Sequence, residues 1–161
     1  MRNISYQTIK TPIGLLEISA TNEAIVTVKP TKIEKELTSS AASSKLVEKC
    51  AKELEEYFAG QRQQFDIPLN PEGTDFQKRV WRTLEKIPYG EIRIYGEIAQ
   101  MMDKPKAARA IGMANHNNPI LILTPCHRVV GADGSLTGYA AGIENKKYLL
   151  ELEKMNVGQF H

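Results

Sequence analysis

Cysteine is scarce in this chain of 161 residues, which contains only Cys50 and Cys126, one in each half. Two isolated cysteines give neither a disulfide framework nor a zinc-ligand spacing, so we expect no metal and a reducing, cytoplasmic setting. Long apolar runs are missing too. None approaches the ~18 residues of a membrane span, and residues 1–6 lack a signal-peptide core. We therefore expect neither a secreted disulfide scaffold nor a membrane partner.

Strong net charge is also absent, since the formal charge is only +2. This value neither requires nor excludes a polyanionic partner, because a local basic face matters more than the total. Hydrophobic residues make up 42% of the chain and charged residues 25%, which is typical of folded proteins and argues against disorder. The length suits one ordinary domain or two small ones.

The first half reads as a small α/β domain over residues 1–70. Short β-branched segments predict strands at 4–9, 14–20 and 24–28. Ser43 and Ser44 are expected to cap a helix over 45–58, which Gly60 ends. Cys50 falls on the apolar stripe of that helix and is predicted to be core. Three nearby glutamates are expected to be solvated, namely Glu53, Glu55 and Glu56.

The second half reads as a mainly helical domain over residues 74–161, after a linker at 68–73. Thr74 and Asp75 are expected to cap a helix over 76–87. Two short helices, 95–102 and 106–115, the second opened by Pro105, suggest a helix-turn-helix. A buried strand is predicted at 120–123, a glycine-rich loop at 131–142 and a last helix at 144–154.

Cys126 and His127 follow the predicted strand directly. A thiolate is a strong nucleophile, and a nearby histidine is a common means of producing it. Neighbours on a strand point to opposite faces, so coupling of the two would need a bend or a bridging water. Taken alone, the pair favours a small buried hydrophobe followed by a solvated His-Arg pair.

The residues around this pair change that interpretation. They comprise Pro88-Tyr89-Gly90-Glu91, Tyr95, residues 106–112 (Lys-Ala-Ala-Arg-Ala-Ile-Gly), Asn118-Pro119, Pro125-Cys126-His127-Arg128-Val129, Gly138-Tyr139 and residues 146–153. At these spacings, residues 76–153 resemble the C-terminal domain of the O6-alkylguanine-DNA alkyltransferases. The first half is similar to that family only in size and strand pattern. The resemblance implies a ribonuclease H-like α/β domain followed by a winged helix-turn-helix-like domain, an α/β (α+β) fold overall.

The resemblance also implies a function, which is direct repair of O6-alkylguanine, and of O4-alkylthymine as an open alternative. The alkyl group would pass irreversibly to Cys126, once per molecule and without a cofactor. His127 would take the thiol proton, and Glu153 would orient the imidazole. Together they would lower the pKa of Cys126 below the free value of about 8.5. Tyr95 would protonate the leaving base, and Asn118 would tie the DNA-binding helix to the Cys126 loop.

The implied partner is double-stranded DNA, bound by a monomer. Arg109 would replace the flipped nucleotide in the stack, and small neighbours would let the helix approach the backbone, namely Ala107, Ala108, Ala110 and Gly112. The base pocket would comprise Tyr95, Val129, Gly138, Tyr139 and Ala140. Main-chain carbonyls of Cys126 and Val129 would accept from the exocyclic amine of guanine.

Small residues in the loop, Gly138, Ala140, Ala141 and Gly142, predict room for benzyl or ethyl adducts. The alternative is that the glycines serve backbone geometry alone. The chain departs from the family pattern at Ala140, where some members have serine, and at Asn117, where glycine is common.

Two other functions stay open on the sequence. An alkyltransferase-like protein would bind damaged DNA without repairing it, although such proteins lack the cysteine. A Cys-His hydrolase or thiol redox protein would need an oxyanion site or a second nearby cysteine.

Overall fold

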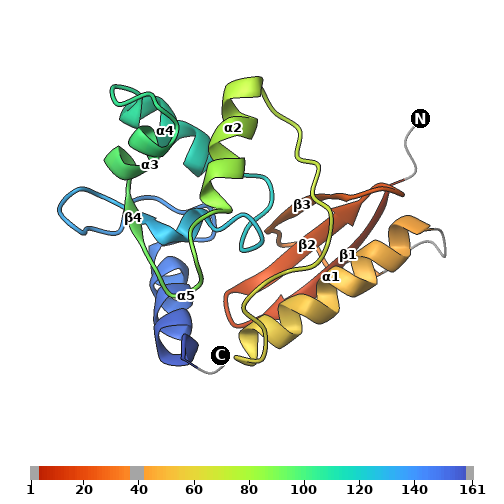
Figure 1. The fold of residues 1–161 in the computed structure, drawn as a ribbon. Helices are drawn as coiled ribbons and strands as arrows, with labels where there is room; N and C mark the ends of the chain where they lie inside the picture. Colours follow the sequence, from red (N-terminus) through yellow and green to blue (C-terminus); the bar gives the residue numbers. More distant parts are fainter. Residues whose placement is uncertain (1–3, 37–41, 159–161) are drawn as a thin grey trace. The chain divides into compact units, whose positions relative to one another are not determined.

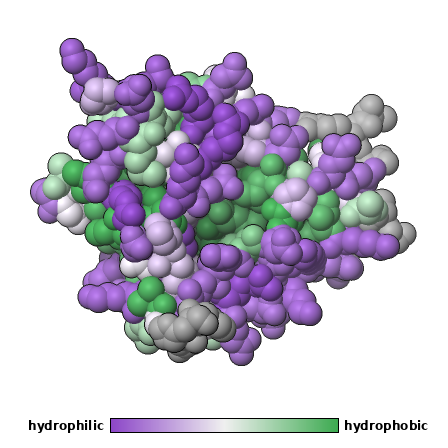
Figure 2. Space-filling model, viewed as in Figure 1, coloured by the Kyte–Doolittle hydropathy of each residue, from purple (hydrophilic) through white to green (hydrophobic). Residues whose placement is uncertain are grey.

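The computed structural model describes residues 4–36 and 42–158, which divide into two compact units at Glu72 and Gly73. Both units contain helices and strands (Figure 1), so the predicted mixed α/β class is confirmed. No helix in the described ranges is long and apolar enough to cross a membrane. Hydrophilic residues cover most of the face shown in Figure 2.

The first unit is an antiparallel sheet in the order β1-β2-β3 with one helix packed against it. Its elements are β1 (Ser5–Thr11), β2 (Gly14–Ala20), β3 (Ile25–Pro30) and α1 (Ala42–Phe58). The core forms where the fully buried Ile18 and Val28 of the sheet and Val47, Cys50 and Leu54 of α1 meet. The predicted strands, the helix and the core position of Cys50 are confirmed.

Two expectations for α1 are wrong. Ser43 and Ser44 lie inside the helix and are buried, so they do not cap it. The Ser43 Oγ instead lies 2.7 Å from the Ser5 Oγ on β1. Glu53 is not solvated: it is 3% exposed. Its Oε1 accepts a hydrogen bond from the Asp66 N–H at 3.0 Å and lies 3.7 Å from Arg62, which compensates the burial of its charge.

The predicted linker begins inside the first unit. Leu69 forms a parallel bridge with Ile25 on β3. The Ile25 N–H donates to the Pro68 carbonyl at 2.9 Å, and the Asn70 N–H donates to the Ile25 carbonyl at 2.8 Å. These bonds cover the open edge of β3. The segment that connects the two units therefore begins after Asn70.

The second unit is mainly helical, with one short parallel strand pair. Its elements are α2 (Asp75–Leu84), β4 (Arg93–Ile94), α3 (Tyr95–Met101), α4 (Ala108–His116), the 3₁₀ helix η1 (Cys126–Arg128), β5 (Val129–Val130) and α5 (Ile143–Asn156). Helices α2, α3 and α4 contact one another. Helices α3 and α4, joined by residues 102–107, form the predicted helix-turn-helix.

Helix boundaries differ from the prediction at two places. The Thr74 cap of α2 is confirmed, because its side chain accepts from the Gln77 N–H in a capping box. This helix ends at Leu84, however, and the buried Ile87 lies beyond it. Pro105 lies in the turn before α4, which begins later than predicted, at Ala108.

The predicted strand at residues 120–123 is wrong. These residues form a buried turn, in which Leu121 bridges Thr124 and Ile122 has a φ of 71°. Four apolar residues in a row indicate burial but do not distinguish a strand from a buried turn. Cys126 and His127 therefore begin a 3₁₀ helix instead of ending a strand.

Candidate active site around Cys126

Asn118 builds the turn that precedes Cys126. Its Nδ2 donates to the carbonyls of Ile120 at 3.2 Å and Thr124 at 2.9 Å, and its Oδ1 accepts from the Ile120 N–H at 3.0 Å. One buried side chain thus satisfies three backbone groups of a turn that has few ladder partners. Because Asn118 comes two residues after α4, it connects the end of that helix to the loop that carries Cys126.

Cys126 and His127 lie in η1 and are both buried, with exposures of 2% and 0%. Successive residues of a 3₁₀ helix diverge by about a third of a turn. The strand geometry that would have placed the two side chains on opposite faces is therefore absent. Both cysteines of the chain are free thiols.

Glu153 of α5 contacts both His127 and Arg128. The Nε2 of His127 is 2.7 Å from Oε2 of Glu153, and Arg128 donates from Nε at 2.8 Å and from an Nη at 3.0 Å to the two carboxylate oxygens. The Gly90 N–H donates to Oε1 at 3.2 Å, and Arg128 also donates to the Ile87 carbonyl at 2.7 Å. The carboxylate, 1% exposed, thus accepts four hydrogen bonds from three residues.

This network fixes the protonation of the imidazole. Burial would raise the pKa of Glu153, but its interactions with His127 and Arg128 hold that pKa well below the usual range. Burial lowers the pKa of His127, which is therefore neutral. Because a carboxylate only accepts, the neutral ring donates from Nε2. Its Nδ1 carries a lone pair and has no partner among the described residues.

The thiol itself is held in its protonated form. Burial raises the pKa of Cys126 to about 11, while the Asn118 side chain and the charge of Lys146 lower it in part. The expected depressed pKa is therefore wrong, because removal of the thiol from water outweighs the polar groups around it. In this state deprotonation needs a base at the moment of reaction.

Lys146 places a positive charge beside the cysteine. It is fully buried in α5, and its Nζ donates to the carbonyls of Val129 at 2.6 Å and Thr137 at 3.3 Å. Burial lowers the pKa of this amine, and the Cys126 thiolate would raise it. The Val129 carbonyl, which was expected to accept from guanine, thus already has a donor.

Tyr95 and Tyr139 approach the site from two segments. The Tyr95 hydroxyl, at the start of α3, lies 2.6 Å from the Thr137 Oγ1. The Tyr139 ring packs edge-on against His127 with 6.5 Å between ring centroids. Its buried hydroxyl has no partner among residues 4–36 and 42–158. Burial raises the pKa of the Tyr139 hydroxyl, and the negative charges of Cys126 and Glu153 add to this effect.

The other predicted site residues lie in α4 and the glycine-rich loop. Arg109 and Ala110 are exposed on α4, Ala107, Ala108 and Gly112 are half-buried, and Gly138 and Ala140 are exposed in the loop. A Cβ at Gly112 would meet the Tyr95 ring at 3.9 Å, and one at Gly138 would meet His116 at 3.7 Å, both ordinary contacts. Gly142 has a φ of 97°, so backbone geometry explains that glycine.

Sequence reasoning missed Arg128, Lys146 and Thr137 as members of this site. Arg128 belongs to the motif around Cys126, but the motif assigned it no role. Its bidentate contact is with Glu153, which lies 25 residues further along the chain. Lys146 lies on a helix where lysine usually faces water. No periodic signal in the sequence could have identified these contacts.

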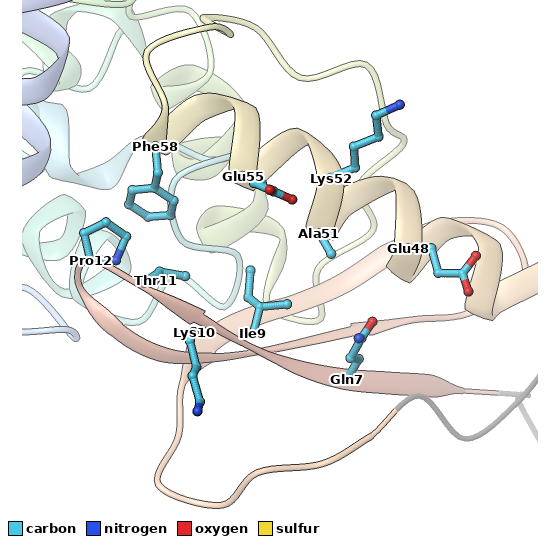
Figure 3. A pocket seen from close by; sticks show the side chains of 10 residues that line it. All are labelled: Gln7, Ile9, Lys10, Thr11, Pro12, Glu48, Ala51, Lys52, Glu55 and Phe58. Atoms are coloured by element: carbon cyan, nitrogen blue, oxygen red, sulfur yellow. The ribbon is translucent and has the colours of Figure 1, made fainter.

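A separate pocket of about 560 Å³ lies in the first unit between β1 and α1 (Figure 3). Apolar Ile9 and Phe58 line it together with charged Lys10, Lys52 and Glu55. Its walls contain no cysteine or histidine. No group of three or more His, Cys, Asp or Glu in the described ranges is arranged to hold a metal.

Comparisons with known proteins agree over both units. Residues 4–71 match the family described as 6-O-methylguanine DNA methyltransferase, ribonuclease-like domain, and residues 75–155 match its DNA binding domain. The methylated-DNA–protein-cysteine methyltransferase of Methanosarcina acetivorans is 46% identical, over 92% of this chain and 97% of that protein. Its namesake in Mycobacterium tuberculosis is 46% identical, over 94% and 93%.

Solved structures are similar as well. The crystal structure of Mycobacterium tuberculosis OGT in complex with DNA has a TM-score of 0.84 and 44% identity, and the similarity covers 94% of this chain and 93% of that one. The fold and the matches define a protein with a ribonuclease-like unit and a helix-turn-helix DNA-binding unit. The chain belongs to the 6-O-methylguanine DNA methyltransferase family.

Proposed function

We propose that this protein repairs O6-alkylguanine in double-stranded DNA by transferring the alkyl group to its own Cys126. The observation that carries the proposal is the buried Cys126-His127-Glu153 arrangement, in which the imidazole presents an unpartnered Nδ1. The relatives named for methyl transfer to a protein cysteine, and the OGT–DNA complex, support it.

The reaction is a displacement at the alkyl carbon. His127 Nδ1 takes the Cys126 proton, directly or through a bridging water, while the sulfur attacks and the bond from carbon to O6 breaks. Tyr95 donates its phenol proton to the departing guanine, which leaves neutral, and the phenolate afterwards regains a proton from the solvent while the imidazolium loses one to it. Glu153 stabilises the imidazolium that forms. The product is a thioether, which no group in this set can cleave, so each molecule acts once.

The DNA-facing roles follow the same proposal. Arg109, exposed on α4, enters the stack in place of the flipped nucleotide, and Ala107, Ala108, Ala110 and Gly112 allow close approach to the backbone. Val129, Gly138, Tyr139 and Ala140 line the base pocket with Tyr95. Residues 1–70 and 74–161 act as the two domains. A monomeric state and a cytoplasmic location stay predictions.

Mass spectrometry tests the proposal directly. Incubation with an oligonucleotide containing O6-methylguanine should add one methyl per chain, and peptide mapping should place it on Cys126. Cys50, where burial raises the pKa to about 12, is the internal control and should stay unmodified. Cys126→Ser should bind DNA without a mass gain. Binding by the native chain without a mass gain would instead favour a damage-binding protein, and multiple turnover would exclude the single-use mechanism.

A further inference from the structure

Met113 places an apolar side chain on the exposed face of α4. The residue is 63% exposed, whereas methionine in folded proteins is usually buried. Residues three or four apart share one face of a helix, so Met113 lies beside Arg109 and His116, which are exposed as well. The buried Ile111 and Ala114 lie on the opposite face. Met113 therefore belongs to the face that α4 presents to solvent.

The composition of this face indicates its partner. Arg109 and His116 can carry positive charge, Lys106 lies just before the helix, and α4 contains no acidic residue. A single exposed apolar residue is ordinary on its own. However, α4 is the second helix of a helix-turn-helix and lies within residues 75–155, which match a DNA binding domain. The minor groove of DNA is only about 6 Å wide, so a helix approaches its floor only where the other side chains are small. On α4 they are small, namely Ala108, Ala110 and Gly112.

An apolar side chain has a particular action in the minor groove. Side chains such as Phe, Leu, Ile and Met wedge between adjacent base pairs and partly unstack them. At a rise of about 1.5 Å per residue, Met113 lies about 6 Å along the helix axis from Arg109, which is close to the length of two base-pair steps of about 3.4 Å. We infer that Met113 is a second DNA-distorting residue, which wedges between base pairs beside the flipped nucleotide and so lowers the free energy needed to extrude it. The inference rests on the proposed function and adds a residue that acts on the DNA alongside Arg109.

The inference predicts an effect that is largest in duplex DNA. In a single strand the target base is already unpaired, so its extrusion costs least and a wedge gains little. The quantity to measure is the ratio of two single-turnover rates, from a duplex and from the single strand of the same sequence, each containing O6-methylguanine and each at saturating concentration. Met113→Ala should lower this ratio by at least about threefold, because it removes the wedge. Met113→Leu should keep the native ratio, because leucine is apolar and of similar volume.

Met155→Ala is the matched control. It removes the same side chain from an even more exposed position, on α5, and should leave the ratio at the native value. Alanine has a higher helix propensity than methionine, so Met113→Ala should not weaken α4, and a thermal melt of each variant checks this. Because each ratio is internal to one protein, partial loss of folding affects both substrates alike.

The outcomes separate the two claims. A ratio that falls in Met113→Ala and keeps its native value in Met113→Leu and Met155→Ala supports the inference. An unchanged ratio in Met113→Ala, or an equal fall in the leucine variant or the control, overturns the role of Met113 while methyl transfer to Cys126 still stands. Failure of the native chain to transfer methyl from either oligonucleotide overturns the proposed function instead.

Discussion

Burial and charge act in opposite directions on the Cys126 thiol. Its removal from water raises the pKa to about 11, and Lys146 and Asn118 recover only part of that shift. With its pKa raised in this way, the thiol is almost entirely protonated at pH 7. The resting protein is therefore protected from small electrophiles, and the His127 base matters only when the alkyl carbon is in place.

A titration of the thiol checks this account. The ultraviolet absorbance of the thiolate, with Cys126→Ser subtracted to remove Cys50, should rise only well above pH 9. Lys146→Met should move the midpoint higher still, because it removes the positive charge that favours the thiolate. Lys147→Met, an exposed neighbour on α5, should leave it unchanged. A native midpoint at or below about 8.5 would contradict the structure.

Thr137 orients the phenol of Tyr95, which we propose as the proton donor to the departing guanine. Its Oγ1 lies 2.6 Å from the Tyr95 hydroxyl, so it can donate to that oxygen while the phenol proton points to the substrate. Thr137→Val keeps the shape and removes the donor. We expect single-turnover transfer to slow by about three- to tenfold, with recovery in Thr137→Ser and no comparable loss in the thermal melt. Equal rates for the valine and serine variants would refute this role.

Among the elements, the helices were predictable and the connection at residues 120–125 was not. The sequences of α1 and α2 show apolar positions at helical spacing, and the Thr74 cap is a local signal. The buried turn has no such signal, because the side chain of Asn118 supplies its hydrogen bonds from outside the segment. The predicted helix cap at Ser43 is wrong for the same reason, because the hydrogen-bond partner of Ser43 is Ser5, on a strand far away in the sequence.

The turn at Gly90 links α5 to the segment before β4. Gly90 has a φ of 82°, and a Cβ there would lie 2.5 Å from Val157. Gly90→Ala should therefore lower the free energy of unfolding by about 1 to 3 kcal/mol through strain and contact. Gly96→Ala is the control, since Gly96 lies in α3 with open space around it and should gain up to about 1 kcal/mol. Urea denaturation measures both, and losses of equal size in the two variants would argue against the strain.

The carboxylate of Glu153 connects α5 to η1. Glu153→Gln removes the negative charge that balances buried Arg128, so we expect a loss of about 3 to 5 kcal/mol at pH 7. Glu151→Gln, exposed on the same helix, should change stability by less than about 0.5 kcal/mol. Urea denaturation at pH 7 gives both values.

The pH dependence of that loss has a definite sign. Because the folded pKa of Glu153 is lowered, its contribution is complete above the ordinary glutamate pKa of about 4.3 and is lost as the pH falls below it. The difference between native and Glu153→Gln unfolding free energies should therefore shrink in acid. A difference that is independent of pH would mean that the carboxylate charge is not what stabilises the contact.

Across the second unit as a whole, the site is assembled from segments far apart in sequence. Gly90, η1, the loop at Thr137 and helix α5 all contribute groups within hydrogen-bond distance of one another. The family resemblance pointed to Cys126, His127 and Glu153, and in the structure His127 bonds Glu153 while Cys126 precedes His127 in η1. It could not reveal which residue bonds which, because the Arg128 and Lys146 contacts depend on how the helices pack.

The interaction of the protein with duplex DNA provides the last prediction. Arg109 is exposed on α4, and we assign it the place of the flipped nucleotide. Arg109→Ala should slow transfer from a duplex by tens-fold or more, because stabilising an extrahelical base is worth a few kcal/mol. Transfer from free O6-benzylguanine, which needs no extrusion, should be almost unchanged. Lys106→Ala removes an exposed charge just before the same helix. It should weaken duplex binding and reduce the salt dependence of that binding, but leave the transfer rate at saturating duplex concentration unchanged. Single-turnover rates on both substrates decide the matter: equal losses in Arg109→Ala would mean that Arg109 supports the pocket or the fold instead of the flipped state.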